Sequence, residues 1–197
     1  MIENGTRYLV IVVLGVVLAA CSVLPQRLTV QPSLEGVESG LVGRSVEVGV
    51  RVVDLRAGID IGYTETWGGD RQPIATTGDL LAVLADSLSE GLRKKGFVPC
   101  ADWAGKGRLL TVEVEKVSHV VVHGLVKTTV QTSVVAKTMA SCGRRTLSNQ
   151  VDVDNQSVMV AKPSIEDNQR LVNKALSDLI EKIFQDQETL VLLARGE

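Results

Sequence analysis

Few side chains of this sequence could perform nucleophilic, redox or metal chemistry: three cysteines and two histidines stand out. His119 and His123 lie four residues apart in a segment whose pattern is typical of a strand approaching a hairpin turn. On a strand, unlike a helix, this spacing does not bring two side chains to one metal ion, and no further ligands cluster nearby in the sequence. The sequence therefore predicts no metal site and no cofactor, with one histidine exposed and the other in a turn.

Other catalytic motifs are weak. No serine stands in the Gly-x-Ser-x-Gly context of a nucleophile elbow, and Gly105 and Gly107 lack the spacing of a phosphate-binding loop. Asp54 and Arg56 could bind a partner or form a local ion pair at the end of a strand. We favour the structural role, because carboxylates and arginines in turns commonly bond nearby groups. These residues predict a protein that is not an enzyme.

A short apolar segment precedes the first cysteine. Residues 8–20 carry no charge and follow Arg7. The run is shorter than the roughly 20 residues that a helix needs to cross a bilayer, and it is typical of a secretory signal. Its end, Leu18-Ala19-Ala20-Cys21, resembles the lipobox of bacterial lipoproteins, in which cleavage leaves the cysteine as the lipidated first residue. The alternative is an ordinary signal peptide or anchor that happens to contain a cysteine.

The lipobox resemblance implies a location. In such lipoproteins Asp after the cysteine favours retention at the inner membrane, whereas Ser22 implies the inner leaflet of the outer membrane, facing the periplasm. The membrane is then a partner through the lipid on Cys21, and several acyl chains hold far better than one. We expect a signal peptide at 1–20, a lipidated N-terminus and tether at 21–43, and a single α/β lipoprotein domain at 44–193.

Cys100 and Cys142 form an even pair once Cys21 carries lipid. In the oxidising periplasm two spare cysteines favour a disulfide. If a hairpin turns near residues 123–124, Cys142 falls opposite about residue 105, and Cys100 lies within reach a few residues upstream. Such a bridge would stabilise the fold by about 3–4 kcal/mol in the chain-entropy model. The alternative is two unpaired, buried thiols.

Regular patterns of apolar residues predict the elements that hold these side chains. Helices are expected after Thr77 and Asp79 and again after Ser164, each with an apolar stripe on one face. Short strands are expected near residues 28–32, 59–63 and 190–193. Longer strands, in which apolar and polar residues alternate, are expected at 46–52, 109–117, 126–140 and 145–154.

Each predicted strand has a single apolar face. This favours an antiparallel meander with water on one side and helices on the other. The predicted fold class is therefore α+β, with a small, mainly antiparallel sheet and two amphipathic helices packed on one face.

The predicted hairpin tip is apolar where a turn is normally polar. Val120, Val121, Val122 and Leu125 are the residues concerned. They could form a protruding edge that binds a protein partner. Equally, they could pack under the N-terminal strand or under the loop before Thr77.

The order of elements resembles that of the YajG-type lipoprotein family, from about Leu28 to Leu193. The most telling motifs are Asp54-Leu55-Arg56 after the first long strand, Gly96-Phe97 at the exit of the first helix, and LVNKALSDLIEKIFQD at residues 171–186. The resemblance implies a small, periplasm-facing α/β lipoprotein without known catalytic residues.

Composition limits the range of functions. The net charge is -2, no stretch concentrates Lys and Arg, and aromatic residues make up 3% of the chain, so nucleic acid is not an expected partner. We expect a non-enzymatic outer-membrane lipoprotein that is a structural or accessory subunit of a cell-envelope assembly, with an envelope protein as partner. The alternative is an accessory lipoprotein that binds a lipid or small ligand for envelope transport, which would need a pocket of a few hundred Å³. A hydrolase comes third, because no convergent polar cluster is found.

Overall fold

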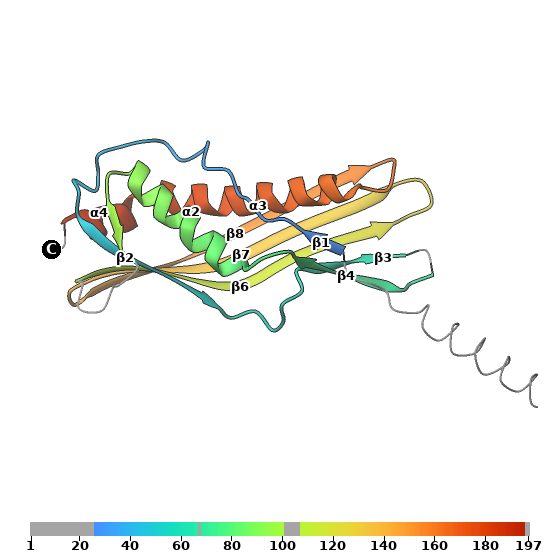
Figure 1. The fold of residues 1–197 in the computed structure, drawn as a ribbon, viewed down its shortest axis with the longest axis horizontal. Helices are drawn as coiled ribbons and strands as arrows, with labels where there is room; N and C mark the ends of the chain where they lie inside the picture. Colours follow the sequence, from blue (N-terminus) through green and yellow to red (C-terminus); the bar gives the residue numbers. More distant parts are fainter. Residues whose placement is uncertain (1–25, 67, 101–106, 196–197) are drawn as a thin grey trace, which may run out of the picture.

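The computed structural model describes residues 26–66, 68–100 and 107–195. In this part of the chain a single curled sheet of eight strands carries three helices on its inner side (Figure 1). In chain order the elements are β1 (Gln26–Leu28), β2 (Glu47–Asp54), β3 (Gly62–Glu65), β4 (Arg71–Thr76), α2 (Leu80–Lys94), β5 (Val98–Cys100), β6 (Arg108–His123), β7 (Thr128–Cys142), β8 (Arg145–Met159), α3 (Ile165–Gln185) and α4 (Gln187–Arg195).

The sheet is mixed. Strands β6, β7 and β8 form a long antiparallel meander. The other edge of β6 is shared by β2 and β3, which pair in parallel with its first and second halves respectively. Strand β4 is antiparallel to β3, β1 is parallel to β4, and β5 is parallel to β2.

The predicted fold class is therefore wrong in size and pairing: the sheet is large, mixed and curled into a half-barrel, and within the described residues it carries three helices instead of two. Alternation shows that a strand has one buried face, but it does not show which strand it pairs with. Strand β4, which contains Pro73, was not predicted. The segment 190–193, expected as a strand, lies in helix α4.

A bulge in β6 decides which of its side chains face the helices. The register with β7 shifts between Val114 and Lys116, so the extra residue Glu115 moves the buried positions from even to odd numbers. His119 therefore faces inward with the core. The buried apolar residues are Leu110, Val112 and Val114 before the bulge and Val117 and Val121 after it.

Both predicted helices are confirmed, and polar side chains fix their starts. The Asp79 carboxylate accepts hydrogen bonds from the backbone N–H groups of Leu81 and Ala82, at 2.9 and 3.3 Å. Ser164 and Asp167 form a reciprocal capping box at the start of α3. The two helices bury their apolar stripes against the sheet and against each other, with the Phe184 ring over Gly91.

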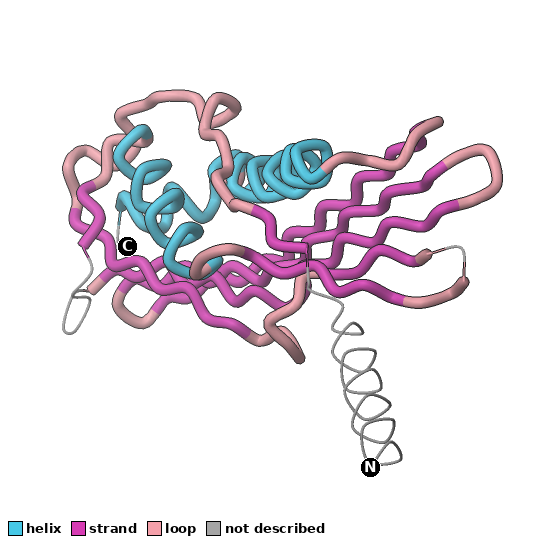
Figure 2. The backbone as a smooth tube through the Cα atoms, turned by 45° about the vertical axis from the view of Figure 1, so that its right-hand side comes forward, coloured by secondary structure: helices cyan, strands magenta, loops and turns pink. Residues whose placement is uncertain are grey.

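The two ends of the sheet differ. Figure 2 shows the hairpin tips of one end extending beyond the start of α3, whereas α2 and α4 cover the other end. Among the described residues, no helix is both long enough and apolar enough to cross a membrane.

Candidate functional site

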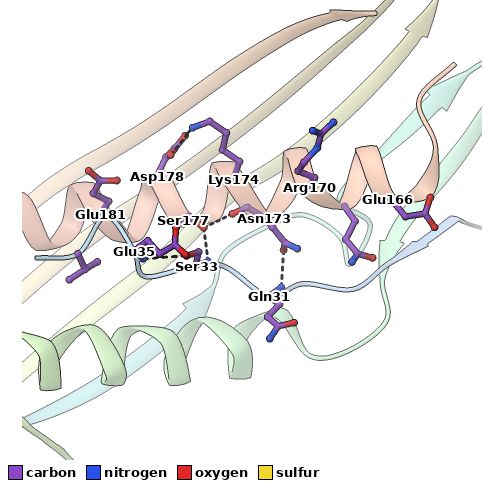
Figure 3. A pocket seen from close by; sticks show the side chains of 13 residues that line it. Gln31, Ser33, Glu35, Glu166, Arg170, Asn173, Lys174, Ser177, Asp178 and Glu181 are labelled. Carbon is purple, nitrogen blue, oxygen red and sulfur yellow. Dashed lines mark hydrogen bonds and ion pairs between the residues drawn. The ribbon is translucent and has the colours of Figure 1, made fainter. Parts of the chain in front are cut away.

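The residues before β2 form an extended segment on helix α3 (Figure 3). Side chains at every fourth position of α3 accept hydrogen bonds from every second backbone N–H of this segment. The three bonds run from Thr29 N to Gln169 Oε1 at 3.1 Å, from Gln31 N to Asn173 Oδ1 at 2.8 Å, and from Ser33 N to Ser177 Oγ at 2.8 Å. This regular match holds residues 29–33 against the domain.

A groove of about 540 Å³ runs between this segment and α3. Its two cationic side chains are paired along the helix: Lys174 bonds Asp178 at 2.8 Å, and Arg170 bonds Asp167 at 2.7 Å. Burial acts to raise the pKa of Asp178, but its hydrogen bonds from Lys174 and Asn155 outweigh this and lower it. The groove is open and polar, and its geometry serves the docking of the segment.

A second hollow, of about 370 Å³, lies at the end of the sheet near the start of α3. Segments far apart in the sequence meet there: β1, β3, β4, β6 and the residues around the N-terminus of α3. Its polar lining consists of Gln26, Thr64, Gln72, His123, Lys162, Ser164 and Asn168. These groups share the lining with Val121, Pro163 and Ile165, so the hollow suits a small ligand that carries polar groups beside apolar ones.

His119 lies behind this hollow, fully buried. Its Nδ1 is 2.8 Å from Thr132 Oγ1 and its Nε2 is 3.2 Å from Asn168 Oδ1. Because Asn168 Nδ2 donates to Gln26 Oε1, its Oδ1 faces the imidazole, which fixes the tautomer with the proton on Nε2. Burial lowers the pKa of His119 below its ordinary value, although the Asn168 hydrogen bond opposes the shift.

His123 lines the hollow itself. Its Nδ1 is bonded to Thr128 Oγ1 at 3.0 Å, whereas its buried Nε2 has no hydrogen-bond partner among the described residues. A buried nitrogen without a partner is a ready donor or acceptor for a ligand in the hollow. The expectation of one exposed and one turn histidine is thus wrong: both rings face inward, one buried and one half-buried at the hollow. His119 and His123 lie two positions before and after buried Val121, and alternation along a strand places all three side chains on one face. This spacing is the signal in the sequence that could have shown that both rings face inward.

The predicted apolar tip divides between the two faces of β6. Val121 is fully buried in the core and lines the end hollow together with Gln26 of β1. Val120 is half-buried and Val122 partly exposed on the opposite face. Leu125 lies in the β6–β7 turn and is exposed. Val121 is thus a core residue at the hollow, and packing of the tip under the N-terminal strand stays a prediction. Binding of a protein partner by the tip stays a prediction.

The two cysteines predicted to pair are both free in the structure, with Cys100 half-buried and Cys142 buried. Cys100 is level with Gly49 of β2, which is level with Leu109 of β6, next to the Arg108–Cys142 pair. Two strands therefore separate the thiols. Three strand spacings amount to about 14 Å, more than twice the usual Cα separation across a disulfide. The expected partner of Cys142 was about residue 105, whereas the structure places Arg108, three residues later, opposite it.

Asp54 and Arg56 form the local ion pair that we favoured. The guanidinium Nε donates to Asp54 Oδ1 and Nη2 to Oδ2, both at 2.8 Å. These side-chain hydrogen bonds are the largest cause of the lowered pKa of Asp54. The pair closes the turn that follows β2.

Cys21, the predicted lipid attachment site, lies outside the described residues, as does the whole predicted signal peptide. Within the described ranges, no group of three or more His, Cys, Asp and Glu side chains gathers closely enough to hold a metal ion.

Comparison with known proteins relates the chain to lipoproteins. A family model described as an uncharacterized lipoprotein matches residues 32–192. No curated protein matches the chain. Among solved structures, a protein from Xanthomonas campestris has a TM-score of 0.50 at 12% identity, over 83% of this chain and 95% of that one. At this identity the similarity shows the fold alone.

Two weaker similarities carry no argument about function. A protein described as a homolog of neuraminyllactose-binding hemagglutinin from Helicobacter pylori has a TM-score of 0.47 at 11% identity, over 84% of this chain and 97% of that one. A protein described as a lipoprotein from Caulobacter crescentus has a TM-score of 0.36 at 15% identity, over 71% and 95%.

Proposed function

Because the chain belongs to this family of uncharacterised lipoproteins, we propose that it is an outer-membrane lipoprotein that carries lipid on Cys21 and faces the periplasm. The observation that carries the proposal is the match over residues 32–192, which follows a segment at residues 1–21 that resembles a signal peptide and lipobox. Ser22 after the cysteine supports the outer membrane over the inner membrane.

Within the envelope, the protein is a non-enzymatic accessory or structural subunit of a larger assembly. Strand β8 supports this role. Among the described strands it pairs only with β7, so its outer edge leaves a long row of backbone donors and acceptors open. Such an edge is a template for a strand of a partner protein.

The experiment is to follow the protein in fractionated envelopes with paired variants. Wild type should reach the outer membrane with lipid on Cys21, and Cys21→Ala should lose both the lipid and membrane attachment. Ser22→Asp is the matched control: it should keep the lipid but shift toward the inner membrane. Lipid-free wild-type protein at the membrane would contradict the anchor, and an unshifted Ser22→Asp variant would contradict the sorting.

The partner is sought by crosslinking the native lipoprotein in cells through side chains on the outer edge of β8. A crosslinker at Gln150 or Gln156, both exposed on β8, should yield one envelope protein reproducibly. The exposed Ala82 on helix α2 is the control position. Equal yields from strand and control positions would contradict a β8 interface.

A second function is favoured by the hollow at the sheet end: binding of a small polar ligand for envelope transport. The buried His123 Nε2 without a described partner supports it. Native mass spectrometry of the gently extracted lipoprotein should then show a bound small molecule, and His123→Phe should reduce its occupancy severalfold. An unliganded mass for the wild type under these conditions would contradict this function.

A further inference from the structure

Exposed apolar side chains gather at one end of the domain. Leu125 and Val126 in the β6–β7 turn are 83% and 72% exposed, and Val160 after β8 is 86% exposed. These three residues line one hollow together with Lys127 and Lys162. Single exposed apolar residues are ordinary, but a cluster with a cationic rim marks an interaction surface.

The strand register shows where the N-terminal chain enters relative to this cluster. Gln26 is level with Ile74 of β4, which is level with Gly62 of β3 and, through it, with His119 of β6. Strand β1 runs opposite to β6, because β4 is parallel to β1 and antiparallel to β3, which is parallel to β6. The N-terminal end of β1 at Gln26 therefore points toward the same end of the sheet as the β6–β7 turn (Figure 1).

Chain length then limits the distance to the predicted anchor. Cys21 precedes Gln26 by five residues, which span at most about 18 Å whatever their path. His119 is the residue of β6 level with Gln26, and the β6–β7 turn starts five residues after it, at Gly124. The opposite end of β6 lies eleven residues away from that level, about 36 Å. A lipid on Cys21 can therefore bring a bilayer to the β6–β7 end and not to the opposite end.

The chemistry of the cluster fits a bilayer surface. Apolar side chains that enter the headgroup region beside lysines bind membranes containing anionic phospholipids. Two carboxylates at this end are engaged, Glu65 with Arg71 at 3.6 Å and Asp167 with Ser164 and Arg170. Among the described residues no ion pair holds Lys127 or Lys162, so both can face phosphate groups.

We propose that this end of the domain, with Leu125, Val126 and Val160 at its tip, rests in the headgroup region of the membrane that holds Cys21. The inference rests on the proposed lipid anchor. It deepens the proposed function, because it fixes the orientation in which the domain stands: tip toward the bilayer, with α2, α4 and β5 farthest from it.

The chain offers three matched positions for a test. Leu125 at the tip, Ile59 at the side and Leu41 at the far end are 83%, 82% and 85% exposed. Ile59 lies between β2 and β3, beside the middle of β6, and Leu41 lies next to Gly96 at the exit of α2. A photoreactive benzoylphenylalanine replaces one of them at a time in the full-length lipoprotein, which is extracted from cells and reconstituted in vesicles of phosphatidylethanolamine and phosphatidylglycerol.

After irradiation, the intact mass reports both the lipid on Cys21 and any phospholipid adduct at the probe. We expect at least five times more adduct from Leu125→benzoylphenylalanine than from either control position. Similar yields from Leu125 and Ile59 would mean that the domain lies on its side, and yields as low as that of Leu41 would mean that the tip does not touch the bilayer. Both results overturn the inference.

The same variants irradiated in cells separate lipid from protein. An adduct of Leu125 with a protein in place of phospholipid would overturn the inference in favour of a partner-binding tip. A lipidated Cys21 without a tip adduct would leave the proposed anchor standing while the orientation fails. A mass without lipid on Cys21 would defeat the proposed anchor and the inference together.

Discussion

At the scale of single residues, His119 is the side chain whose position in the fold differs most from the expectation drawn from the sequence. A strand that the sequence marks only by alternation carries it into the core, where Thr132 and Asn168 satisfy both ring nitrogens. A neutral imidazole needs one donor and one acceptor, and Thr132 Oγ1 and Asn168 Oδ1 supply them to the tautomer protonated on Nε2. The ring therefore joins β6, β7 and α3 through one polar contact inside an apolar core.

The burial of this ring makes stability depend on pH. Burial lowers the pKa of His119 below its ordinary value of 6.5, so the unfolded state takes up a proton that the folded state does not. The free energy of unfolding is therefore expected to fall as the pH drops below about 6.5, and to keep falling until the pH reaches the lowered pKa of the folded state. The His119→Gln variant, which cannot titrate there, should show a flatter profile over this range, whatever its overall stability. Urea denaturation at a series of pH values measures both, and equally steep profiles would contradict the account.

The cysteines give a second prediction at this scale. Two strands separate Cys100 and Cys142, so both thiols should be free in protein unfolded without a reductant. Alkylation under denaturing conditions should then add two adducts to the intact mass. In the lipidated protein, in which the Cys21 sulfur carries lipid, a Cys100→Ser, Cys142→Ser double variant has no thiol and is the control for background labelling. If the intact mass showed adducts only after reduction, the two cysteines would be joined by a disulfide and the prediction would be wrong.

At the scale of elements, the helices and the long meander could be predicted because their signals are local. Asp79 and Ser164 cap the helices whose apolar stripes follow them, and alternation marks β6 to β8. The prediction of a strand at residues 190–193 was wrong, because a run of four apolar residues fits a strand or a helix equally well. Its helix starts where the Asp186 carboxylate accepts hydrogen bonds from the N–H groups of Glu188 and Thr189.

Long-range features of the sheet and the site could not be predicted. The parallel pairing of β2 and β3 with one strand depends on contacts between distant segments, and the bulge at Glu115 has no distinctive local sequence. The residues that line the hollow at the sheet end come from four elements, so no local sequence motif predicts it. Among them are Gln26, Thr64, His123 and Asn168. The His119 prediction failed for the same reason, since the bulge decides its face.

The docking of residues 29–33 on α3 is testable through Asn173. This side chain accepts from Gln31 N at 2.8 Å and donates to Thr29 O at 3.3 Å. Asn173→Ala should lower the free energy of unfolding by about 1 kcal/mol and speed hydrogen exchange of the Gln31 amide. Lys174→Ala, on the exposed neighbouring position, is the control and should leave that amide unchanged. An unaltered exchange rate in Asn173→Ala would contradict the ladder.

The crossing of α2 and α3 depends on the absence of a side chain at Gly91. A Cβ there would meet the buried Phe184 ring. Although Ala favours a helix over Gly by about 1 kcal/mol, overpacking of this contact should make Gly91→Ala destabilising by about 1–3 kcal/mol. In a Phe184→Leu background the same change should cost less, because the ring is gone. Equal costs in both backgrounds, measured by denaturation, would show that the crossing does not constrain Gly91.

At the scale of the whole molecule, the half-barrel separates two kinds of surface. Its inner side is filled by the three helices, and the hollows found among the described residues lie open at its margins. Its ends differ: one carries exposed apolar residues with lysines near the entry of the N-terminal chain, and the other is closed by α2, α4 and β5. A lipid at Cys21 would account for the difference between the two ends, because it would orient one end toward the membrane and the other toward the periplasm.

The central claim is therefore the lipid on Cys21, and the intact mass of the protein purified from envelope membranes tests it most directly. The account predicts a chain that starts at Cys21, lacks residues 1–20 and carries the added mass of a diacylglyceryl group and an N-linked acyl chain. A chain that retains Met1, or one cleaved elsewhere with an unmodified Cys21, would contradict it.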